Sequence, residues 1–87
     1  MSKKRVLIVD DHPLMRQGLA QLINHEPGLQ VVGEASDAAA GLSAVIELKP
    51  DLVIIDISLP GKNGLELIKD IRACTKEPAL LVHSMHD

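Results

Sequence analysis

The 87-residue sequence contains no phenylalanine, tyrosine or tryptophan. Because aromatic rings are a common platform for bases, flavins and sugars, this absence argues against a ligand that is held by stacking. A single cysteine, Cys74, excludes an internal disulfide and fits a reducing compartment. No apolar run reaches membrane-spanning length, and residues 1–30 lack a signal-peptide pattern. We therefore expect a cytoplasmic protein that has no contact with the membrane.

Net charge and length limit the class of protein further. The net charge of −3 gives no electrostatic footprint for nucleic acid, and 46% hydrophobic with 24% charged residues is ordinary for a globular chain. At this length we expect one small domain over residues 1–87. No internal repeat, linker or low-complexity segment interrupts it.

Short apolar runs alternate with longer stretches that have helical periodicity. The runs at 5–9, 29–33, 52–55 and 79–82 are expected to be strands, which gives the order βαβαβαβ. Three of them are unbroken apolar runs, as is typical of a parallel sheet with helices on both faces, whereas 29–33 is more polar and fits an edge. The sequence therefore predicts an α/β fold.

Capping residues set the expected helix starts. Pro13 suits the first helical position after His12 or Asp11, Ser36 is expected to cap the second helix, and Asn63 caps the third with Glu66 in a capping box. The expected inward-facing residues are Leu14, Gly18, Leu22 and Ile23 in the first helix, Ala38, Leu42, Val45 and Ile46 in the second, and Leu67, Ile68, Ile71 and Cys74 in the third.

Polar residues stand at three of the predicted strand ends. Asp10 and Asp11 follow the first strand, Asp56 follows the third, and Ser84 follows the fourth. In an open α/β sheet, ligands bind outside the carboxyl ends of the strands. If the first and third strands are neighbours, three carboxylates meet at one rim, and such a group is costly without a cation. Asp11 alone could simply cap the next helix, but Asp56 lies between apolar neighbours and caps nothing nearby.

Hard oxygen ligands with room for water suit Mg²⁺. A carboxylate beside such a cation can also act as a nucleophile, because aspartate forms acyl phosphates in several phosphoryl-transfer systems. Ser84 could offer its hydroxyl to a phosphoryl oxygen, or bond only to its own backbone.

These motifs together resemble the receiver domain of bacterial response regulators. The segments VLIVDDHPLMRQGL, VVGEASDAAAGL, PDLVIIDISLPGKNGLELIKDIR and LLVHSMHD carry the likeness, which runs from Arg5 to Asp87. It is strongest to the subfamily whose members usually carry a helix-turn-helix output domain. The resemblance implies a flavodoxin-like parallel sheet in the strand order 2-1-3-4, here with four strands and three helices.

The resemblance also implies roles for individual residues. Asp56 would accept a phosphoryl group from a histidine kinase, with Mg²⁺ held by Asp11 and Asp56 directly, by Asp10 through water, and by the backbone carbonyl of Ser58. Ser84 would be the switch hydroxyl. Other positions match loop-shaping residues (Pro60, Gly64) and residues that tune the lifetime of the phosphoryl group (Ser58, His86). His12, His25 and His83 lack metal-ligand spacing, and no function is assigned to them.

The likeness is incomplete at its C-terminal side. A whole receiver continues with a helix, a strand and another helix, and the strand supplies a lysine that contacts the phosphoryl group. The chain is therefore expected to be a truncated receiver without an output domain, slow in phosphoryl transfer, and able to bind DNA only through the missing part. Its fourth strand would have an open edge, so we expect self-association through that side or through the uncovered face beside the first helix.

Three alternatives stay open at this point. A phosphatase of the haloacid dehalogenase type would need a second aspartate at the position of Ser58. A nucleotide-binding module would need a phosphate loop where DDHPLM stands. The three aspartates disfavour a pseudo-receiver, which serves only protein contacts without phosphorylation, for the parent protein, but this alternative stays open for the truncated fragment. We expect a signalling domain rather than an enzyme.

Overall fold

The computed structural model describes residues 3–59 and 61–83. Seven elements alternate along the chain: β1 (Lys4–Val9), α1 (Pro13–His25), β2 (Leu29–Ala35), α2 (Ala38–Leu48), β3 (Leu52–Asp56), α3 (Gly64–Cys74) and β4 (Ala79–His83). Each strand agrees with its prediction to within one or two residues at either end. None of the helices in the described part of the chain is long and apolar enough to cross a membrane.

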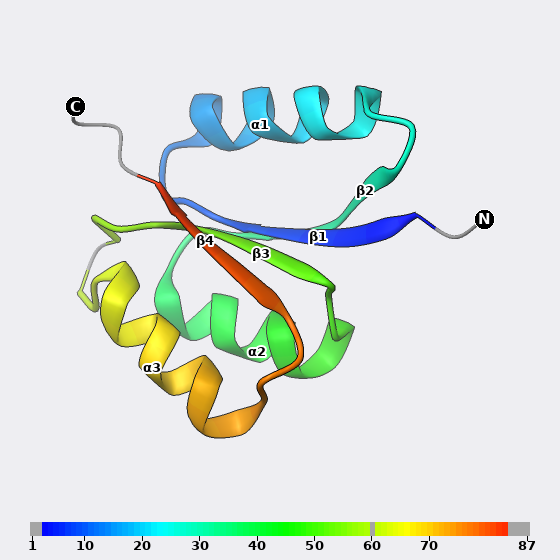
Figure 1. Cartoon of the computed structure of the whole chain (residues 1–87). Coiled ribbons are helices and arrows are strands. Elements are labelled where there is room, and N and C mark those ends of the chain that lie inside the picture. Colours follow the sequence, from blue (N-terminus) through cyan, green and yellow to red (C-terminus); the bar gives the residue numbers. More distant parts are fainter. Residues whose placement is uncertain (1–2, 60, 84–87) are drawn as a thin grey trace.

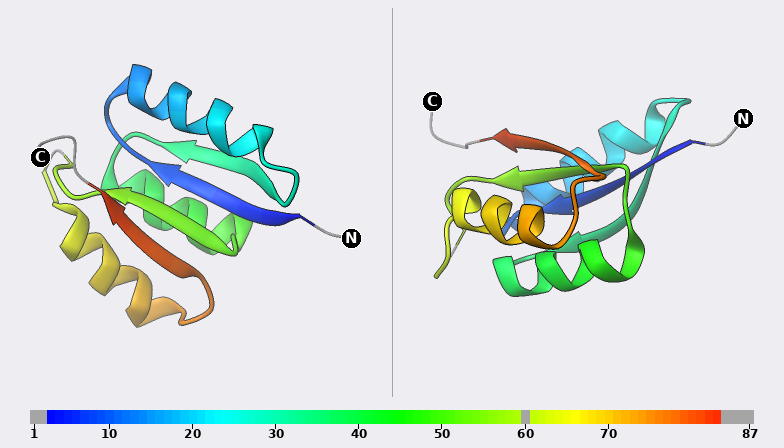
Figure 2. Two further views of the ribbon diagram at one scale, coloured as in Figure 1. Left: turned by 45° about the horizontal axis from the view of Figure 1, so that its top comes forward. Right: turned by 60° about the horizontal axis from the view of Figure 1, so that its bottom comes forward.

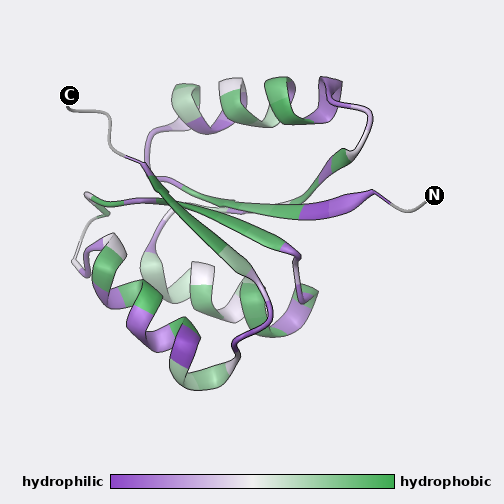
Figure 3. Cartoon of the chain, in the orientation of Figure 1, coloured by the Kyte–Doolittle hydropathy of each residue, from purple (hydrophilic) through white to green (hydrophobic). Residues whose placement is uncertain are grey.

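The four strands form one parallel sheet in the order β2-β1-β3-β4, which confirms the predicted order and the edge position of β2. The helix α1 covers one face, and α2 and α3 cover the other (Figures 1 and 2). Because both faces of the central strands are covered, β1 and β3 carry apolar side chains on successive residues, and their ribbons are hydrophobic through the middle of the molecule (Figure 3).

Two apolar cores result, one on each side of the sheet. The larger core packs α2 and α3 against Leu7, Val9, Val53 and Ile55. The smaller core packs α1 through Ile23 against Val6, Ile8 and Ile54, with Leu19 and Ala20 partly buried beside it.

The prediction for the inner face of α1 was wrong except at Ile23. Leu14 and Leu22 are 83% and 69% exposed, and Gly18 is also exposed. The helix rests on the side formed by Leu19, Ala20 and Ile23, so Leu22 lies on its flank and Leu14 and Gly18 face away from the sheet. Apolar character predicted burial here, but no described segment covers that flank.

Other corrections concern helix ends. Ile46 in α2 is 54% exposed, whereas Ala38 and Val45 are buried as predicted. Cys74 is exposed because it ends α3, while Leu67 and Ile71 are buried.

Side chains cap two of the helices, α2 and α3, and the predicted capping residue is correct for α3 only. The capping box of Asn63 and Glu66 is present at α3. At α2 the cap is Asp37 and not Ser36: the Asp37 carboxylate accepts a hydrogen bond from the Ala40 backbone N–H at 2.8 Å.

Candidate functional site

The parallel pairing of β1 with β3 brings the acidic residues together. Val9 pairs with Ile55, so Asp10 and Asp56 come at the same rim of the sheet, one strand apart. Both side chains are fully buried, and that of Asp11 is 31% exposed. Ligand atoms of Asp10, Asp11, Asp56 and His12 all lie within 4.8 Å of one another.

Hydrogen bonds hold one oxygen of each buried carboxylate. Asp56 Oδ1 accepts from the Ser58 backbone N–H at 3.0 Å and from the Ser58 hydroxyl at 3.1 Å. Asp10 Oδ1 accepts from the His12 backbone N–H at 2.8 Å. These contacts fix the side chains in place, and the second oxygen of each has no hydrogen-bond partner among the described residues.

The remaining carboxylate oxygens test whether a cation fits. Oδ2 of Asp10, Oδ2 of Asp56 and Oδ1 of Asp11 are buried atoms without a hydrogen-bond partner among the described residues. A buried carboxylate is costly unless a charge or hydrogen bond compensates it. Several such oxygens converging at one rim are the donor set that a hard divalent cation takes. The residues therefore fit a divalent metal ion.

His12 lies among the carboxylates. Its Nδ1 is 2.9 Å from Asp10 Oδ1, 3.0 Å from Asp11 Oδ1 and 3.4 Å from Asp56 Oδ2. The hydrogen bond to Asp10, together with the negative charges of Asp11, Asp10 and Asp56, raises the pKa of His12 above its usual value near 6.5. Sequence reasoning assigned no function to this residue. The available signal was its place directly after the paired aspartates.

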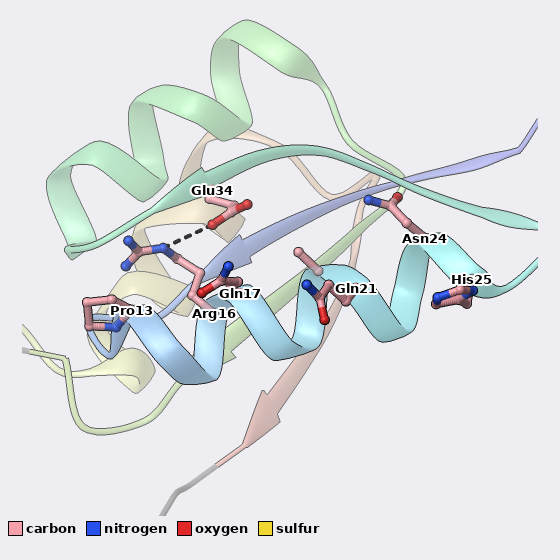
Figure 4. A pocket seen from close by; sticks show the side chains of 8 residues that line it. Pro13, Arg16, Gln17, Gln21, Asn24, His25 and Glu34 are labelled. Atoms are coloured by element: carbon pink, nitrogen blue, oxygen red, sulfur yellow. Dashed lines mark hydrogen bonds and ion pairs between the residues drawn. The ribbon is translucent and has the colours of Figure 1, made fainter.

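A second histidine, His83 of β4, also lies near the acidic rim. It pairs with Asp56 across β3 and β4, and its Nε2 lies 3.3 Å from Asp10 Oδ2. His25, by contrast, stands at the far end of α1, where it lines an open groove with Gln21 and Asn24 (Figure 4).

Arg16 links that groove to the acidic rim. Its Nη1 donates to the backbone carbonyl of Asp10 at 2.7 Å, and its Nε donates to Glu34 Oε1 of β2 at 3.1 Å (Figure 4). The guanidinium thus ties the start of α1 to the end of β1. This contact was not anticipated from the sequence, because it joins residues from three elements.

The loop after β3 is shaped by close packing at Gly64. A Cβ at this position would lie 2.6 Å from the backbone oxygen of Asp56 and 2.8 Å from Ile57 Cα. The Gly64 N–H also donates to the Ile57 carbonyl at 2.9 Å. Only glycine allows α3 to begin this close to the strand that carries Asp56.

Not every predicted site residue is placed by the structure. Ser84, His86 and Pro60 lie outside the described residues, and their roles stay predictions. Lys62 pairs with Asp70 at 2.6 Å on the surface and does not approach the acidic rim.

The fold and the rim define a class: a parallel α/β domain with buried carboxylates at the ends of two adjacent strands. Residues 6–87 match the family model of the response regulator receiver domain. The chain belongs to this family.

Individual relatives agree with that assignment. The chain is 40% identical over 80 residues to the nitrate/nitrite response regulator protein NarL of Escherichia coli, covering 92% of this chain and 37% of that protein. A two-component response regulator of the LuxR family from Aurantimonas superimposes with a TM-score of 0.93 at 40% identity, over 99% of this chain and 61% of that one. The signal receiver domain of the putative response regulator NarL from Mycobacterium tuberculosis gives 0.93 at 34% identity, over 100% and 70%. The chain thus spans well under half the length of its curated relative.

Proposed function

We propose that this chain receives a signal as a phosphoryl group on Asp56, delivered from a phosphohistidine of a sensor histidine kinase. The observation that carries the proposal is the Asp56 side chain, which is fully buried at the end of β3. Its Oδ2 has no hydrogen-bond partner among the described residues, and two further carboxylates lie beside it. Membership of the receiver family supports the same reading.

The transfer is a nucleophilic displacement at phosphorus. A carboxylate oxygen of Asp56 forms the new P–O bond, the P–N bond of the phosphohistidine breaks, and the departing imidazole keeps the electron pair and takes up a proton from solvent. The product is a mixed anhydride on Asp56. The protein's own part is positioning, and Ser58 does this by donating two hydrogen bonds to Oδ1.

Asp11 and Asp56 would hold Mg²⁺ directly, Asp10 through water, and Ser58 through its backbone carbonyl. The bound ion would offset the negative charge of the carboxylates and of the phosphoryl oxygens. The buried oxygens of Asp10, Asp11 and Asp56 that have no hydrogen-bond partner among the described residues support this assignment.

The wider setting follows from the relatives. We propose a cytoplasmic location, a sensor histidine kinase as donor, and control of transcription through a DNA-binding output domain outside this chain. The chain would act as a signalling domain whose only chemistry is its own phosphorylation and dephosphorylation.

The test is chemical labelling of Asp56. The chain is incubated with Mg²⁺ and acetyl phosphate, and phosphorylation is measured by intact-protein mass spectrometry, with Asp56→Asn as control. A gain of one phosphoryl group that the variant loses is the expected result. A longer version that includes the helix and strand with which a whole receiver continues is treated in parallel, and no labelling in either version would refute the proposal.

A second proposal concerns assembly. We propose self-association through the α1 side of the sheet, where Leu14 and Leu22 of α1 and Leu81 of β4 are 83%, 69% and 53% exposed. Leu81 pairs with Ile54, which belongs to the α1-side core, so the three side chains lie on the same side of the sheet. Exposed apolar surface and an unpaired strand edge both favour contact with another chain.

Light scattering at increasing concentration tests this surface. Leu22→Gln is expected to shift the population toward monomer, whereas Leu65→Gln, at an exposed leucine on α3, leaves it unchanged. A stable monomer at high concentration in the parent chain would contradict the proposal.

A further inference from the structure

The side chain of His12 does not behave as a helix cap. The residue occupies the N-cap position of α1 with extended backbone angles, φ −98° and ψ 107°, and makes no side-chain capping hydrogen bond. Its ring is directed at the acidic rim and is 40% exposed, so that it lies between the carboxylates and solvent.

The distances around Nδ1 have the size of a coordination polyhedron. With metal–ligand bonds of about 2.1 Å, adjacent ligand atoms lie about 3.0 Å apart at octahedral angles and about 3.4 Å apart at tetrahedral angles. Nδ1 lies 2.9, 3.0 and 3.4 Å from oxygens of Asp10, Asp11 and Asp56. The 2.9 Å contact is a hydrogen bond to Asp10, so a metal ion would replace its proton and would find Nδ1 at ligand spacing from three carboxylate oxygens.

A second observation independently points to a ligand at this rim. Oδ2 of Asp10 and Oδ2 of Asp56 belong to fully buried side chains and have no hydrogen-bond partner among the described residues. The group thus offers unsatisfied buried oxygens together with an imidazole. That mixture is different from an all-oxygen site.

We propose that His12 Nδ1 is a metal ligand and that the site binds first-row transition dications, represented by Mn²⁺, in preference to Mg²⁺. The inference rests on the proposed function, which places a divalent ion on the same carboxylates. Imidazole nitrogen is a good ligand for transition metals, whereas Mg²⁺ prefers oxygen and gives up its waters reluctantly. Replacement of one metal-bound water by the His12 imidazole therefore favours binding of a transition metal over binding of Mg²⁺.

The decisive readout is the nitrogen coupling of bound Mn²⁺. Pulsed electron paramagnetic resonance of the whole chain loaded with Mn²⁺ is expected to show ¹⁴N modulation from a coordinated imidazole, and selective ¹⁵N labelling of histidine is expected to change it. His12→Gln is expected to abolish the modulation. His25→Gln serves as the matched control and is expected to retain it, because this ring lies at the far end of α1, away from the three carboxylates.

Affinity gives a second measurement on the same proteins. The ratio of the Mg²⁺ to the Mn²⁺ dissociation constant, measured by calorimetry, is expected to fall by about tenfold or more in His12→Gln, since loss of even an outer-shell partner often costs that much affinity. Replacement of His25 is expected to leave the ratio unchanged.

The outcomes separate the two proposals. If Mn²⁺ binds without nitrogen coupling, or with coupling that survives His12→Gln, the inference is refuted: His12 is then only a counter-ion that the metal displaces, and the proposed phosphorylation of Asp56 stands. If neither Mn²⁺ nor Mg²⁺ binds, the inference and the metal-dependent part of the proposed function are both refuted.

Discussion

Gly64→Ala is a sharp test of how the acceptor strand is positioned. The added Cβ would lie 2.6 Å from the backbone oxygen of Asp56, 2.8 Å from Ile57 Cα and 3.1 Å from Ile55 Cγ2. Two of these contacts are with backbone, which cannot rotate away. Relief therefore requires α3 and the end of β3 to move apart by several tenths of an ångström.

The magnitude follows from two opposing effects. Overpacking of a well-packed site typically costs about 1–3 kcal/mol. Alanine returns up to about 1 kcal/mol, because glycine has the greater conformational freedom in the unfolded chain. We expect Gly64→Ala to lower the free energy of unfolding by about 1–2 kcal/mol and to slow the labelling of Asp56.

Gly18→Ala is the matched control. This glycine lies inside α1, is exposed, and has no atom within 4 Å of a built Cβ. Alanine there is expected to raise the free energy of unfolding by about 0.5–1 kcal/mol. Urea denaturation of both variants gives the answer, and equal or greater stability of Gly64→Ala relative to the parent would refute the packing argument.

The remaining predictions concern the metal, the titration of the rim and a helix cap. Asp11→Ala is expected to weaken Mg²⁺ binding strongly in calorimetry while His25→Ala does not, and equal affinity in the parent and Asp11→Ala would overturn the ligand assignment. The pKa of His12 is raised in the folded state, so protonated His12 stabilises the metal-free chain. This contribution is full below about pH 6.5 and is lost as pH rises through the folded pKa. Urea midpoints measured across that range should therefore fall in the parent and stay flatter in His12→Gln. Asp37→Ala is expected to cost about 1 kcal/mol of unfolding free energy through loss of the α2 cap, whereas Ser36→Ala costs little, and the reverse order in urea titrations would contradict the observed cap.

The apolar runs of the sequence predicted the parallel strands, and the resemblance to the receiver family supplied the strand order that brings the aspartates together. Apolar runs that end at Val9 and Ile55 predict parallel strands, and parallel strands bring their carboxyl ends to one rim. The position of Asp10 beside Asp56 follows from topology alone.

Side-chain environments were less predictable, for identifiable reasons. Leu14 and Leu22 are apolar, but which flank of a helix is covered depends on elements that a periodic pattern does not name. Ser36 and Asp37 are both good caps, and β2 continuing to Ala35 decides between them. The contact of His12 with three carboxylates depends on the side-chain conformation of His12, which residue spacing in the sequence does not predict.

The unequal size of the two cores has a consequence for local opening. Ile23 is the one buried residue of α1, whereas α2 and α3 share the larger core. Amide protons of α1 are therefore expected to exchange with solvent sooner than those of β1 and β3, as a separate cooperative unit. His12 and Arg16 belong to that unit and Asp56 does not, so an ion held between them would connect two regions that otherwise open independently. Slower amide exchange in α1 would then show that an ion occupies the acidic rim, although this site lies beyond the N-terminal end of the helix.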